Sequence, residues 1–415
     1  MFAVLTSARN LPHPDPARRE GGRPAPSGLL RRLMRTAGVG AAALWLAACE
    51  PITMAAPERG PQLEPDAPIR VALLVPGGSG QSGDTQLATS LENAARLAVS
   101  DLSGVRVDLR VYNTAGSAER AAQQASLAVS EGAQIILGPV FSDSARAAGQ
   151  AVAGSNVSVL SFSNNPNAAG GNVFIMGPTF ENTARRLASY AQREGKGSVL
   201  AVYERNESGE IGRRAIQQGV SAAGGTMAGV EGFDFSQQGV VEAVPRIADM
   251  ARSNAAQSIF FTSNSAGALP LLMQLLPENG VRPQEYQFIG LTRWDIPPAT
   301  LELSGVQGGW FALPDPSLTA QFNARYRGAF GRDPHPSAAL AYDGIAAVGA
   351  LARSGRSDPL GRSALTQASG FAGVNGAFRL RPDGTNERGL AVAQIRDSQV
   401  IVIDPAPRSF VGPGF

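Results

Sequence analysis

The stretch Ile69-Arg70-Val71-Ala72-Leu73-Leu74-Val75, bounded by Pro76-Gly77-Gly78, decides the fold of this 415-residue chain. It predicts a strand, because it is a short apolar run that ends at a turn signal. The segment 85–101 that follows predicts a helix, since its apolar residues recur at helical spacing on one face. A strand that leads directly into such a helix is the first half of a βαβ unit and indicates a parallel sheet.

The same alternation of strands and helices runs through most of the chain. Before a break near Gly170-Gly171 it predicts further segments at 105–112, 117–131, 134–137, 144–153 and 157–162. After the break it restarts with segments at 181–194, 198–203, 210–223, 226–233, 240–252, 258–262, 266–276 and 286–291. The C-terminal part adds helices at 318–330 and 337–354, and an antiparallel pair, 376–381 with 390–403, joined through Asp383-Gly384. The sequence therefore predicts an α/β chain with two doubly wound halves, each a parallel sheet with helices on both faces.

The N-terminal region has the build of an export signal. A basic stretch, 31–35, precedes an apolar run, 37–48, that ends in small residues. This run is too short to span a bilayer, which takes about 20 residues. The only cysteine, Cys49, closes the string Leu46-Ala47-Ala48-Cys49, which resembles the lipobox of bacterial lipoproteins. The resemblance implies that 1–48 is a removable leader and that Cys49 carries a lipid; the alternative is a buried free thiol behind an ordinary signal peptide.

Two further expectations concern this leader. The residues before Arg31 fit no export signal, so translation begins either at Met1 or at Met34. Glu50, rather than an aspartate, follows the cysteine, and the lipoprotein resemblance then favours the outer membrane over the inner one.

Removing residues 1–48 changes the charge of the chain. That segment holds seven arginines and two acidic residues, so 29 of the 36 basic and 32 of the 34 acidic residues remain. The net charge moves from +2 to −3, and no basic face is left for nucleic acid. A single cysteine supports neither a disulfide framework nor a thiolate metal site. We expect no nucleic-acid partner, no metal and no cofactor.

Several strings in the chain resemble type I periplasmic solute-binding proteins of the leucine-binding kind. They lie at 69–76, 134–142, 160–165, 338–344 and 373–380. The resemblance covers residues 69 to about 404 and implies two lobes that are joined by three chain crossings. It also implies a periplasmic location, which agrees with the export signal.

The resemblance divides the chain as follows. The crossings are expected near Met176-Gly177-Pro178, Gly308-Gly309-Trp310 and Val374-Asn375-Gly376. Lobe 1 is then 69–177 plus 309–375, and lobe 2 is 178–308 plus 376–404. The proline-rich segment 49–68 is a lipidated tether, and 405–415 is a C-terminal tail.

Within that superfamily the chain is most similar to the penicillin-binding-protein activator lipoproteins, which regulate peptidoglycan synthases. The strings concerned are Ser263-Asn264-Ser265-Ala266-Gly267 and Gly290-Leu291-Thr292-Arg293-Trp294-Asp295. The second resembles the G-T-x-x-W segment of that group, with the threonine one place later. This implies a non-enzymatic, membrane-anchored regulator that contacts a peptidoglycan synthase or another envelope protein. The alternative is a substrate-binding lipoprotein that delivers an amino acid or another small polar solute to an ABC permease.

Polar side chains follow the predicted strands of both lobes, where ligands bind in open α/β sheets. We expect the cleft to be lined by Ser82, Ser142, Ser161, Ser163, Asn165, Tyr203, Asn264, Thr292 and Trp294. Hydroxyls and amides bind a small polar ligand without the desolvation cost of a charge. The same residue types also form turns and helix N-caps, and a tryptophan also suits a core, so both interpretations stay open.

The resemblance also bears on what the cleft can bind. Amino-acid-binding relatives hold the ligand carboxylate with a Ser/Thr pair in lobe 1 and the ammonium with an acid from a lobe 2 loop. Ser142 matches one member of the pair, whereas Asn165 stands in place of threonine. Near the place of the acid the chain has Thr292-Arg293-Trp294, with Asp295 displaced. Because a buried ammonium needs its carboxylate, the sequence argues against capture of an ordinary amino acid.

Two other interpretations are weaker. The string 78–83 spells G-x-G-x-x-G, but a dinucleotide site needs an acid after the second strand, where Tyr112-Asn113 stand. His335, the only histidine after the leader, lies between Pro334 and Pro336 with no nucleophile elbow nearby. We therefore predict that the protein is not an enzyme.

Overall fold

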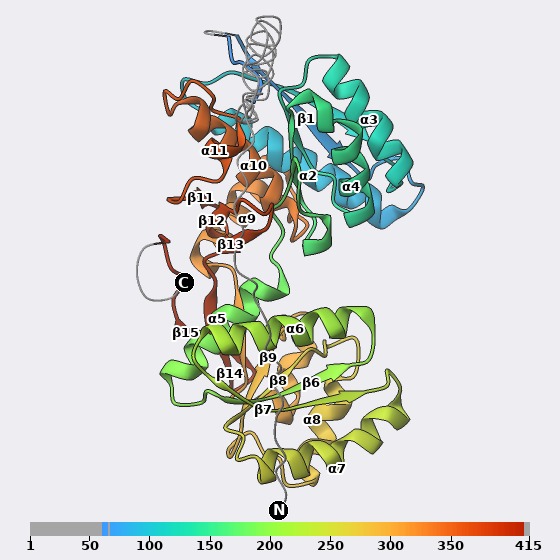
Figure 1. Cartoon of the computed structure of the whole chain (residues 1–415), viewed down its shortest axis with the longest axis vertical. Coiled ribbons are helices and arrows are strands. Elements are labelled where there is room, and N and C mark those ends of the chain that lie inside the picture. Colours follow the sequence, from blue (N-terminus) through green and yellow to red (C-terminus); the bar gives the residue numbers. More distant parts are fainter. Residues whose placement is uncertain (1–59, 65–66, 411–415) are drawn as a thin grey trace, which may run out of the picture. The chain divides into compact units, whose positions relative to one another are not determined.

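The computed structural model describes residues 60–64 and 67–410 (Figure 1). The predicted leader, Cys49, most of the predicted tether and the end of the predicted tail lie outside the described residues. Within them, strands and helices alternate from β1 (Ile69–Val75) to β9 (Gln287–Gly290), as the sequence predicts, whereas two strands that it does not predict, β5 (Val173–Ile175) and β10 (Trp310–Leu313), each follow 3₁₀ turns instead of an α-helix. None of the helices in this described part is long and apolar enough to cross a membrane.

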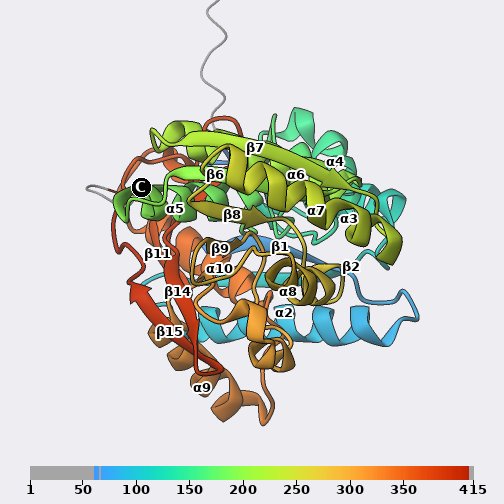
Figure 2. The same cartoon turned by 90° about the horizontal axis from the view of Figure 1, so that it is seen from below.

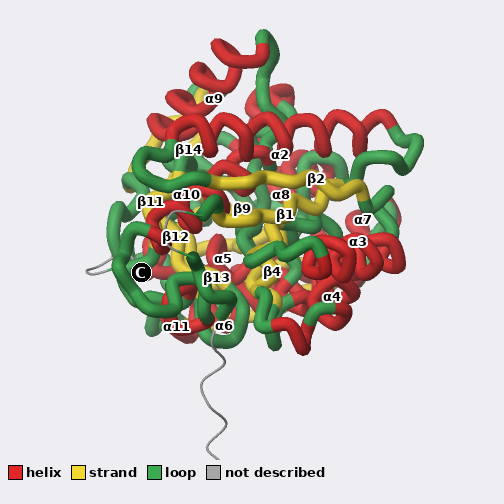
Figure 3. Tube along the Cα trace, turned by 90° about the horizontal axis from the view of Figure 1, so that it is seen from above, coloured by secondary structure: helices red, strands yellow, loops and turns green. Residues whose placement is uncertain are grey.

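A five-stranded parallel sheet, in the order β2-β1-β3-β4-β5, forms the centre of lobe 1. Its strands after β1 are β2 (Val107–Asn113), β3 (Ile135–Leu137), β4 (Ser158–Ser161) and β5 (Val173–Ile175). Side chains alternate between the faces of a strand, so Leu73 packs with helices α2 (Ser82–Asp101) and α10 (Ala338–Ala352). Leu74 packs on the other face with α3 (Ala118–Ser130) and α4 (Ser142–Ala151). Figure 3 shows α2 lying along β1 and β2.

A seven-stranded sheet forms the centre of lobe 2, in the order β15-β14-β10-β9-β8-β6-β7, with β7 and β15 at its two edges (Figure 2). The parallel strands are β6 (Ser198–Glu204), β7 (Thr226–Phe233), β8 (Ser258–Phe261), β9 (Gln287–Gly290) and β10. One face packs on α5 (Phe180–Arg193) and α6 (Glu207–Ala222), the other on α7 (Gln237–Ser253) and α8 (Leu269–Glu278). Both lobes are thus doubly wound, which confirms the predicted fold class.

The C-terminal region supplies the remaining elements. Helix α9 (Pro316–Phe330) and the short α11 (Arg362–Leu365) join α10 in the core of lobe 1. A small antiparallel sheet contains β11 (Phe371–Gly373), β12 (Gly376–Leu380) and β13 (Asn386–Arg388). Four 3₁₀ turns complete the described elements: η1 (Ala153–Ser155), η2 (Pro166–Ala168), η3 (Pro298–Glu302) and η4 (Ser304–Val306).

The predicted antiparallel pair of 376–381 with 390–403 is wrong. Strand β12 pairs with β13, across the Asp383-Gly384 turn, and with β11. The segment 390–403 instead holds two strands, β14 (Ala391–Arg396) and β15 (Gln399–Asp404), that pair with each other. Asp397 and Ser398, with φ of 52° and 59°, form the two-residue turn between them. A tight hairpin turn of this kind takes positive φ at both positions, which glycine tolerates best and asparagine and aspartate next.

Two of the three expected crossings are also misplaced. Strand β10 pairs with β9, Trp310 opposite Ile289, so residues 310–313 belong to lobe 2 and the second crossing follows them. In β12, Phe378 and Leu380 pack in the core of lobe 1, so the third crossing lies after β13 rather than before β12. The glycines at 308–309 and 376 mark turns, which resemble crossings in sequence because both interrupt a regular pattern. The first passage from lobe 1 to lobe 2 runs between Met176 and Phe180.

Candidate functional site

The order of the strands locates the candidate site. In lobe 2, β6 lies between β7 and β8, so the chain leaves β6 towards one neighbour and later returns to the other. In lobe 1, β1 lies between β2 and β3 in the same way. Ligands of open α/β sheets bind beyond the carboxyl ends of strands at such switch points, because the following loops diverge there. The loops after β1 and β3 in lobe 1, and after β6 and β8 in lobe 2, are therefore the first place to look.

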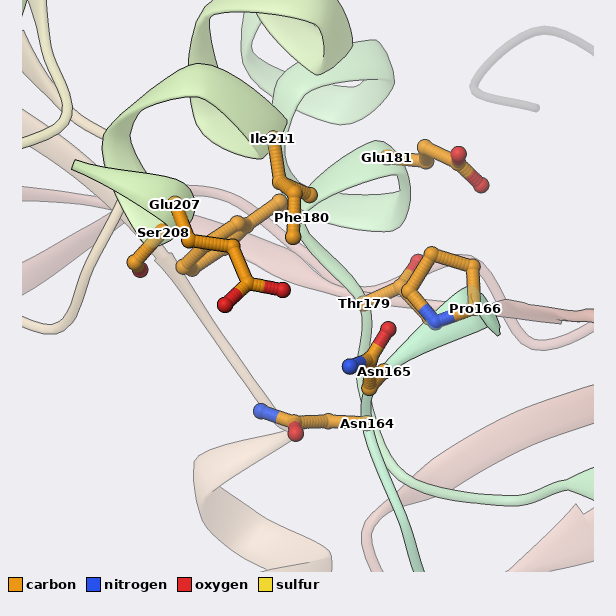
Figure 4. A pocket seen from close by; sticks show the side chains of 9 residues that line it. All are labelled: Asn164, Asn165, Pro166, Thr179, Phe180, Glu181, Glu207, Ser208 and Ile211. Carbon is orange, nitrogen blue, oxygen red and sulfur yellow. The ribbon is translucent and has the colours of Figure 1, made fainter. Parts of the chain in front are cut away.

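A pocket of about 240 Å³ lies between the helix that follows β6 and the loop after β4, the strand next to β3 (Figure 4). Lobe 1 contributes Asn164, Asn165 and Pro166, the first crossing and α5 contribute Thr179, Phe180 and Glu181, and α6 contributes Glu207, Ser208 and Ile211. In Figure 4 the carboxylate of Glu207 points into the pocket, towards the side on which both amides lie, and Glu181 points away. The pocket thus combines amides and a carboxylate with the apolar side chains of Phe180 and Ile211.

Helix caps hold this pocket in shape. The hydroxyl of Thr179 accepts the N–H of Asn182 at 3.2 Å and begins α5. The side-chain oxygen of Asn206 accepts the N–H of Gly209 at 2.8 Å and begins α6. Each cap stabilises the first turn of its helix by about 1 kcal/mol. The caps therefore fix where Phe180 and Glu207, the first residues of the two helices, stand.

The two predicted serines at the end of β4, Ser161 and Ser163, form hydrogen bonds to nearby backbone groups. Ser161 is 0% exposed, and its Oγ donates to the carbonyl of Pro139 at 2.8 Å and accepts the N–H of Ser163 at 3.1 Å. The Oγ of Ser163 accepts the N–H of Asn165 at 3.1 Å. Asn165 caps η2 through its Oδ1 and also lines the pocket. The two hydroxyls thus shape the loop, and of these three residues only Asn165 reaches the pocket.

The other lobe 1 candidates lie at helix starts. Ser82 is the exposed first residue of α2, and Ser142 is the partly exposed first residue of α4. Neither lines the pocket described above. In the glycine string before α2, Gly78 and Gly80 have φ of 85° and 79°. Glycine is the residue that adopts such positive φ without steric cost, so the turn itself accounts for these two glycines.

Of the polar candidates of lobe 2, Tyr203 lies in β6, Asn264 follows β8 and Thr292 follows β9. Tyr203 is half-buried in β6, with the Arg213 guanidinium 5.5 Å from its ring centre. Asn264 is exposed and accepts the N–H of Ala266 at 3.0 Å. Thr292 donates its hydroxyl to the carbonyl of Ser263 at 3.3 Å. The structure gathers Asn264 and Thr292 beside the β6 switch point but leaves Tyr203 on the strand.

The structure shows that the predicted place of Trp294 in the cleft is wrong. Its side chain is 0% exposed and packs in the core of lobe 2, with its ring centre 6.2 Å from that of Phe261. Gly290 and Gly309 make room for it, because a methyl group at either position would lie 2.3 Å or 2.5 Å from the indole. The neighbouring Arg293 pairs with Asp295, its Nε donating to Oδ1 at 2.6 Å. The loop after β9 therefore presents neither an indole nor a free carboxylate to a ligand.

Sequence reasoning missed Glu204, the last residue of β6. This residue is 8% exposed, and its Oε2 accepts from the side-chain amide of Asn206 at 3.2 Å. Its Oε1 has no hydrogen-bond partner among the described residues. An acid at the end of a buried strand was the available signal, since charged side chains are rarely buried without a partner. The pocket residues Thr179, Phe180 and Ile211 carried no comparable signal.

A polar network surrounds two of the segments that join the lobes. The amide of Asn386 in β13 donates to the carbonyls of Ile175 and Gly177, each at 2.8 Å. Asn182 in α5 donates to the carbonyl of Asn386 at 2.9 Å. In the same strand, Glu387 pairs with Arg185 of α5 at 2.5 Å. Burial by itself raises the pKa of Glu387, but its contacts with Arg185 and Arg379 outweigh burial, so the pKa is lowered. Strand β13 is thus bonded to both the first crossing and the first helix of lobe 2.

No cluster of three or more His, Cys, Asp or Glu side chains that could hold a metal ion occurs among residues 60–64 and 67–410. No curated protein matches the chain. The family model described as periplasmic binding protein, in contrast, matches residues 68–399.

Solved structures of similar fold are numerous. A branched-chain amino acid ABC transporter periplasmic ligand-binding protein from Burkholderia xenovorans is 19% identical, with a TM-score of 0.62, over 83% of this chain and 97% of that one. An ABC transporter substrate-binding protein from Desulfitobacterium hafniense in complex with Leu is 19% identical, with a TM-score of 0.59, over 81% and 100%. An ABC transporter solute-binding protein from Rhodopseudomonas palustris in complex with 3,4-dihydroxybenzoic acid is 16% identical, with a TM-score of 0.56, over 83% and 98%. At these identities the likeness shows the fold alone.

Proposed function

Because the chain belongs to the periplasmic binding protein family, we propose that it is the substrate-binding protein of an ABC transporter and captures a small polar solute between its lobes. Proteins of this family work in the periplasm and bind solutes rather than transform them. The observation that carries the proposal is the pocket whose walls come from Asn165 in lobe 1, Phe180 at the first crossing and Glu207 in lobe 2. A solute there touches both lobes at once.

The mechanism that we propose is closure of the lobes on the solute. A ligand shifts a conformational equilibrium only by its differential affinity for the two states, and contacts to both lobes are made fully only in the closed state. Hinge motion needs a few segments at the crossings that absorb the change in backbone angles. The bonds of Asn386 to Ile175 and Gly177 would keep β13 and the first crossing moving together.

A thermal-shift screen of small solutes tests this function. A solute that binds only the folded protein at 100 times its Kd stabilises it by about 2.7 kcal/mol, which raises the melting temperature by several degrees. Asn165→Ala should remove the shift, whereas Gln284→Ala, an exposed amide outside the pocket, should retain it. Absence of a shift with every class of polar solute would contradict the proposed function.

We further propose that Cys49 carries a lipid and holds the protein at a membrane, with the outer membrane favoured by Glu50. The proposal rests on the lipobox-like string and the proline-rich segment that follows it. Mass spectrometry of the full chain made in a bacterial host should find residues 1–48 removed and acyl chains on Cys49. Cys49→Ser should shift the protein from the membrane fraction to the soluble one, and a wild-type protein already soluble would overturn the anchor.

A second candidate is regulation of a peptidoglycan synthase, as in the penicillin-binding-protein activators. The pairing of Arg293 with Asp295 supports this second candidate. An amino-acid receptor is expected to hold the ligand ammonium with a free carboxylate from a lobe 2 loop, and the loop after β9 offers none. Co-purification with a peptidoglycan synthase from detergent-solubilised membranes, without a thermal shift by any solute, would favour this candidate over solute capture.

A further inference from the structure

Residues 60–64, at the end of the predicted tether, are docked on lobe 1. The N–H of Gly60 donates to both carboxylate oxygens of Asp358, each at 3.0 Å. The side-chain amide of Gln134 donates to the carbonyl of Gln62 at 2.9 Å. Leu63 packs against the core of lobe 1. Lobe 1 therefore includes the chain from Gly60 onward, before the first residue of β1.

This docking lies at the amino ends of the lobe 1 strands. Gln134 directly precedes β3, and its Oε1 accepts the N–H of Arg70 in β1 at 3.0 Å. The N–H of Ile69, the first residue of β1, donates to the carbonyl of Arg106 at 2.9 Å. The candidate site, in contrast, lies beyond the carboxyl ends of the strands. We call the surface at the amino ends the basal face; it comprises residues 60–64, 69–70, 103–106, 134 and 352–358.

The proposed lipid anchor is close to this basal face along the chain. Gly60 is the eleventh residue after Cys49, so their Cα atoms are at most about 40 Å apart, whatever the conformation of the residues between them. A tether that ran to residue 68 would allow about 70 Å. The docking of residues 60–64 thus keeps the basal face nearer to an acylated Cys49, and so to a membrane.

The basal face is positively charged. It carries four exposed arginines that form no ion pair with a carboxylate of the described residues: Arg70, Arg106, Arg353 and Arg356. Neighbouring carboxylates are paired elsewhere, since Asp108 and Glu131 contact Arg110, and Asp101 contacts Arg325. The four arginines are therefore available to an external anion.

A hollow on the basal face is suited to a phosphate group. It has a volume of about 360 Å³, and Arg70 and Arg106 both line it. Arg353 lies beside it, because its Nη1 donates to the carbonyl of Ser103 at 3.3 Å, next to the lining loop. Glu64 is the one carboxylate among the described lining residues, so arginine predominates. A guanidinium group stays charged and forms paired hydrogen bonds with phosphate oxygens.

We propose that the basal face of lobe 1 rests on the anionic lipid headgroups of the membrane that holds the anchor. This inference rests on the acylation of Cys49 that is part of the proposed function. Arg70 and Arg106 contact lipid phosphates, and each arginine near the surface strengthens the attraction about fivefold. The carboxyl ends of the lobe 1 strands, and with them the cleft, are then directed away from the bilayer.

Hydrogen exchange followed by mass spectrometry tests the basal contact separately from the anchor. The processed, acylated protein is reconstituted on vesicles of phosphatidylcholine alone, or of phosphatidylcholine with about one third phosphatidylglycerol. The lipid holds the protein on both kinds of vesicle, so a difference between them reports on charge. We expect peptides that cover 102–106 and 353–358 to exchange about threefold more slowly on the anionic vesicles. High salt should remove this difference, because it screens exposed charges.

A pair of double variants identifies the face concerned. Arg106→Gln with Arg353→Gln should remove most of the slowing, because two contributions of about fivefold are lost. The matched control is Arg214→Gln with Arg396→Gln, which removes the same charge from exposed arginines of lobe 2 and should retain the slowing. Both double variants should melt at the wild-type temperature, since the replaced side chains are exposed.

The possible failures are distinguishable. Equal exchange on the two kinds of vesicle, or full slowing in the basal double variant, would overturn the basal contact and leave the anchor and the solute capture intact. Slowing confined to peptides of lobe 2 would also overturn it. A mass spectrum without acyl chains on Cys49 would overturn the anchor and the basal contact together, while solute capture would stand on its own thermal-shift test.

Discussion

Arg388 and Asp343 form an ion pair buried in lobe 1, with 3.7 Å between Arg388 Nη1 and Asp343 Oδ2. Asp343 lies in α10 and is 0% exposed, and Arg388 is the last residue of β13, next to the third crossing. Arg388 Nε also donates to the carbonyl of Met176 at 2.8 Å, and Asp343 accepts the N–H of Val374 at the same distance. One buried pair therefore ties α10 to the first and third of the segments that join the lobes.

Replacement of Asp343 by alanine should destabilise the protein strongly. The change leaves Arg388 buried without its counter-charge, which costs about 3–5 kcal/mol of unfolding free energy. Urea denaturation followed by circular dichroism measures the loss. The matched control is Asp333→Ala, which breaks the exposed Arg327–Asp333 pair and should cost about 1 kcal/mol or less. Equal effects of the two substitutions would show that burial of the Asp343 pair has no energetic consequence.

The same carboxyl should make stability depend on pH. Burial raises the pKa of Asp343 from 3.8 to about 6, although Arg388 opposes the shift. Between these values the folded protein holds a proton that the unfolded chain has lost, so this contribution is complete below about pH 4 and disappears as pH rises through about 6. Relative to Asp343→Asn, which does not titrate, the wild-type unfolding free energy should fall by about 3 kcal/mol from pH 4 to pH 7. A difference that is flat or rises with pH would contradict the raised pKa.

Trp294 should matter for stability and not for solute binding. Trp294→Ala removes a fully buried side chain from the core of lobe 2 and should cost about 3–5 kcal/mol. Trp294→Phe keeps most of the volume, so it should fold and retain the affinity for any solute that the wild type binds. Titration of the phenylalanine variant checks this. Loss of binding in a variant that remains as stable as wild type would return the tryptophan to the cleft.

The fold could be predicted from the sequence because its signals are local. Strand β1 begins and ends at the predicted residues, since its apolar run stops at a proline-glycine turn. Strand β5 was not predicted, because three residues are too short for a pattern and are held by pairing with β4. The pairing of β10 with β9 and of β14 with β15 also depends on contacts between segments, and this is why two crossings and the C-terminal pair were misplaced.

The site was predicted less well, for a physical reason. Serine, asparagine and threonine serve loops and ligands with the same hydrogen bonds, and the sequence does not tell which partner they take. Ser161 and Ser163 bond to their own loop, whereas Asn165 caps a turn and also reaches the pocket. Trp294 fits a core as well as a cleft by composition, and only its surroundings place it inside.

The alternation that begins at 69–75 determined the doubly wound α/β architecture by itself, because burial on both faces of a parallel sheet requires that pattern of apolar residues. The tertiary structure decided which carboxylates form ion pairs with arginine. Asp295 is bound by Arg293, Asp343 by Arg388, and Glu204 retains an oxygen without a protein partner among the described residues. Charge pairing across loops depends on distances of a few ångströms between residues far apart in the chain, and such distances exist only once the sheet and its loops have formed.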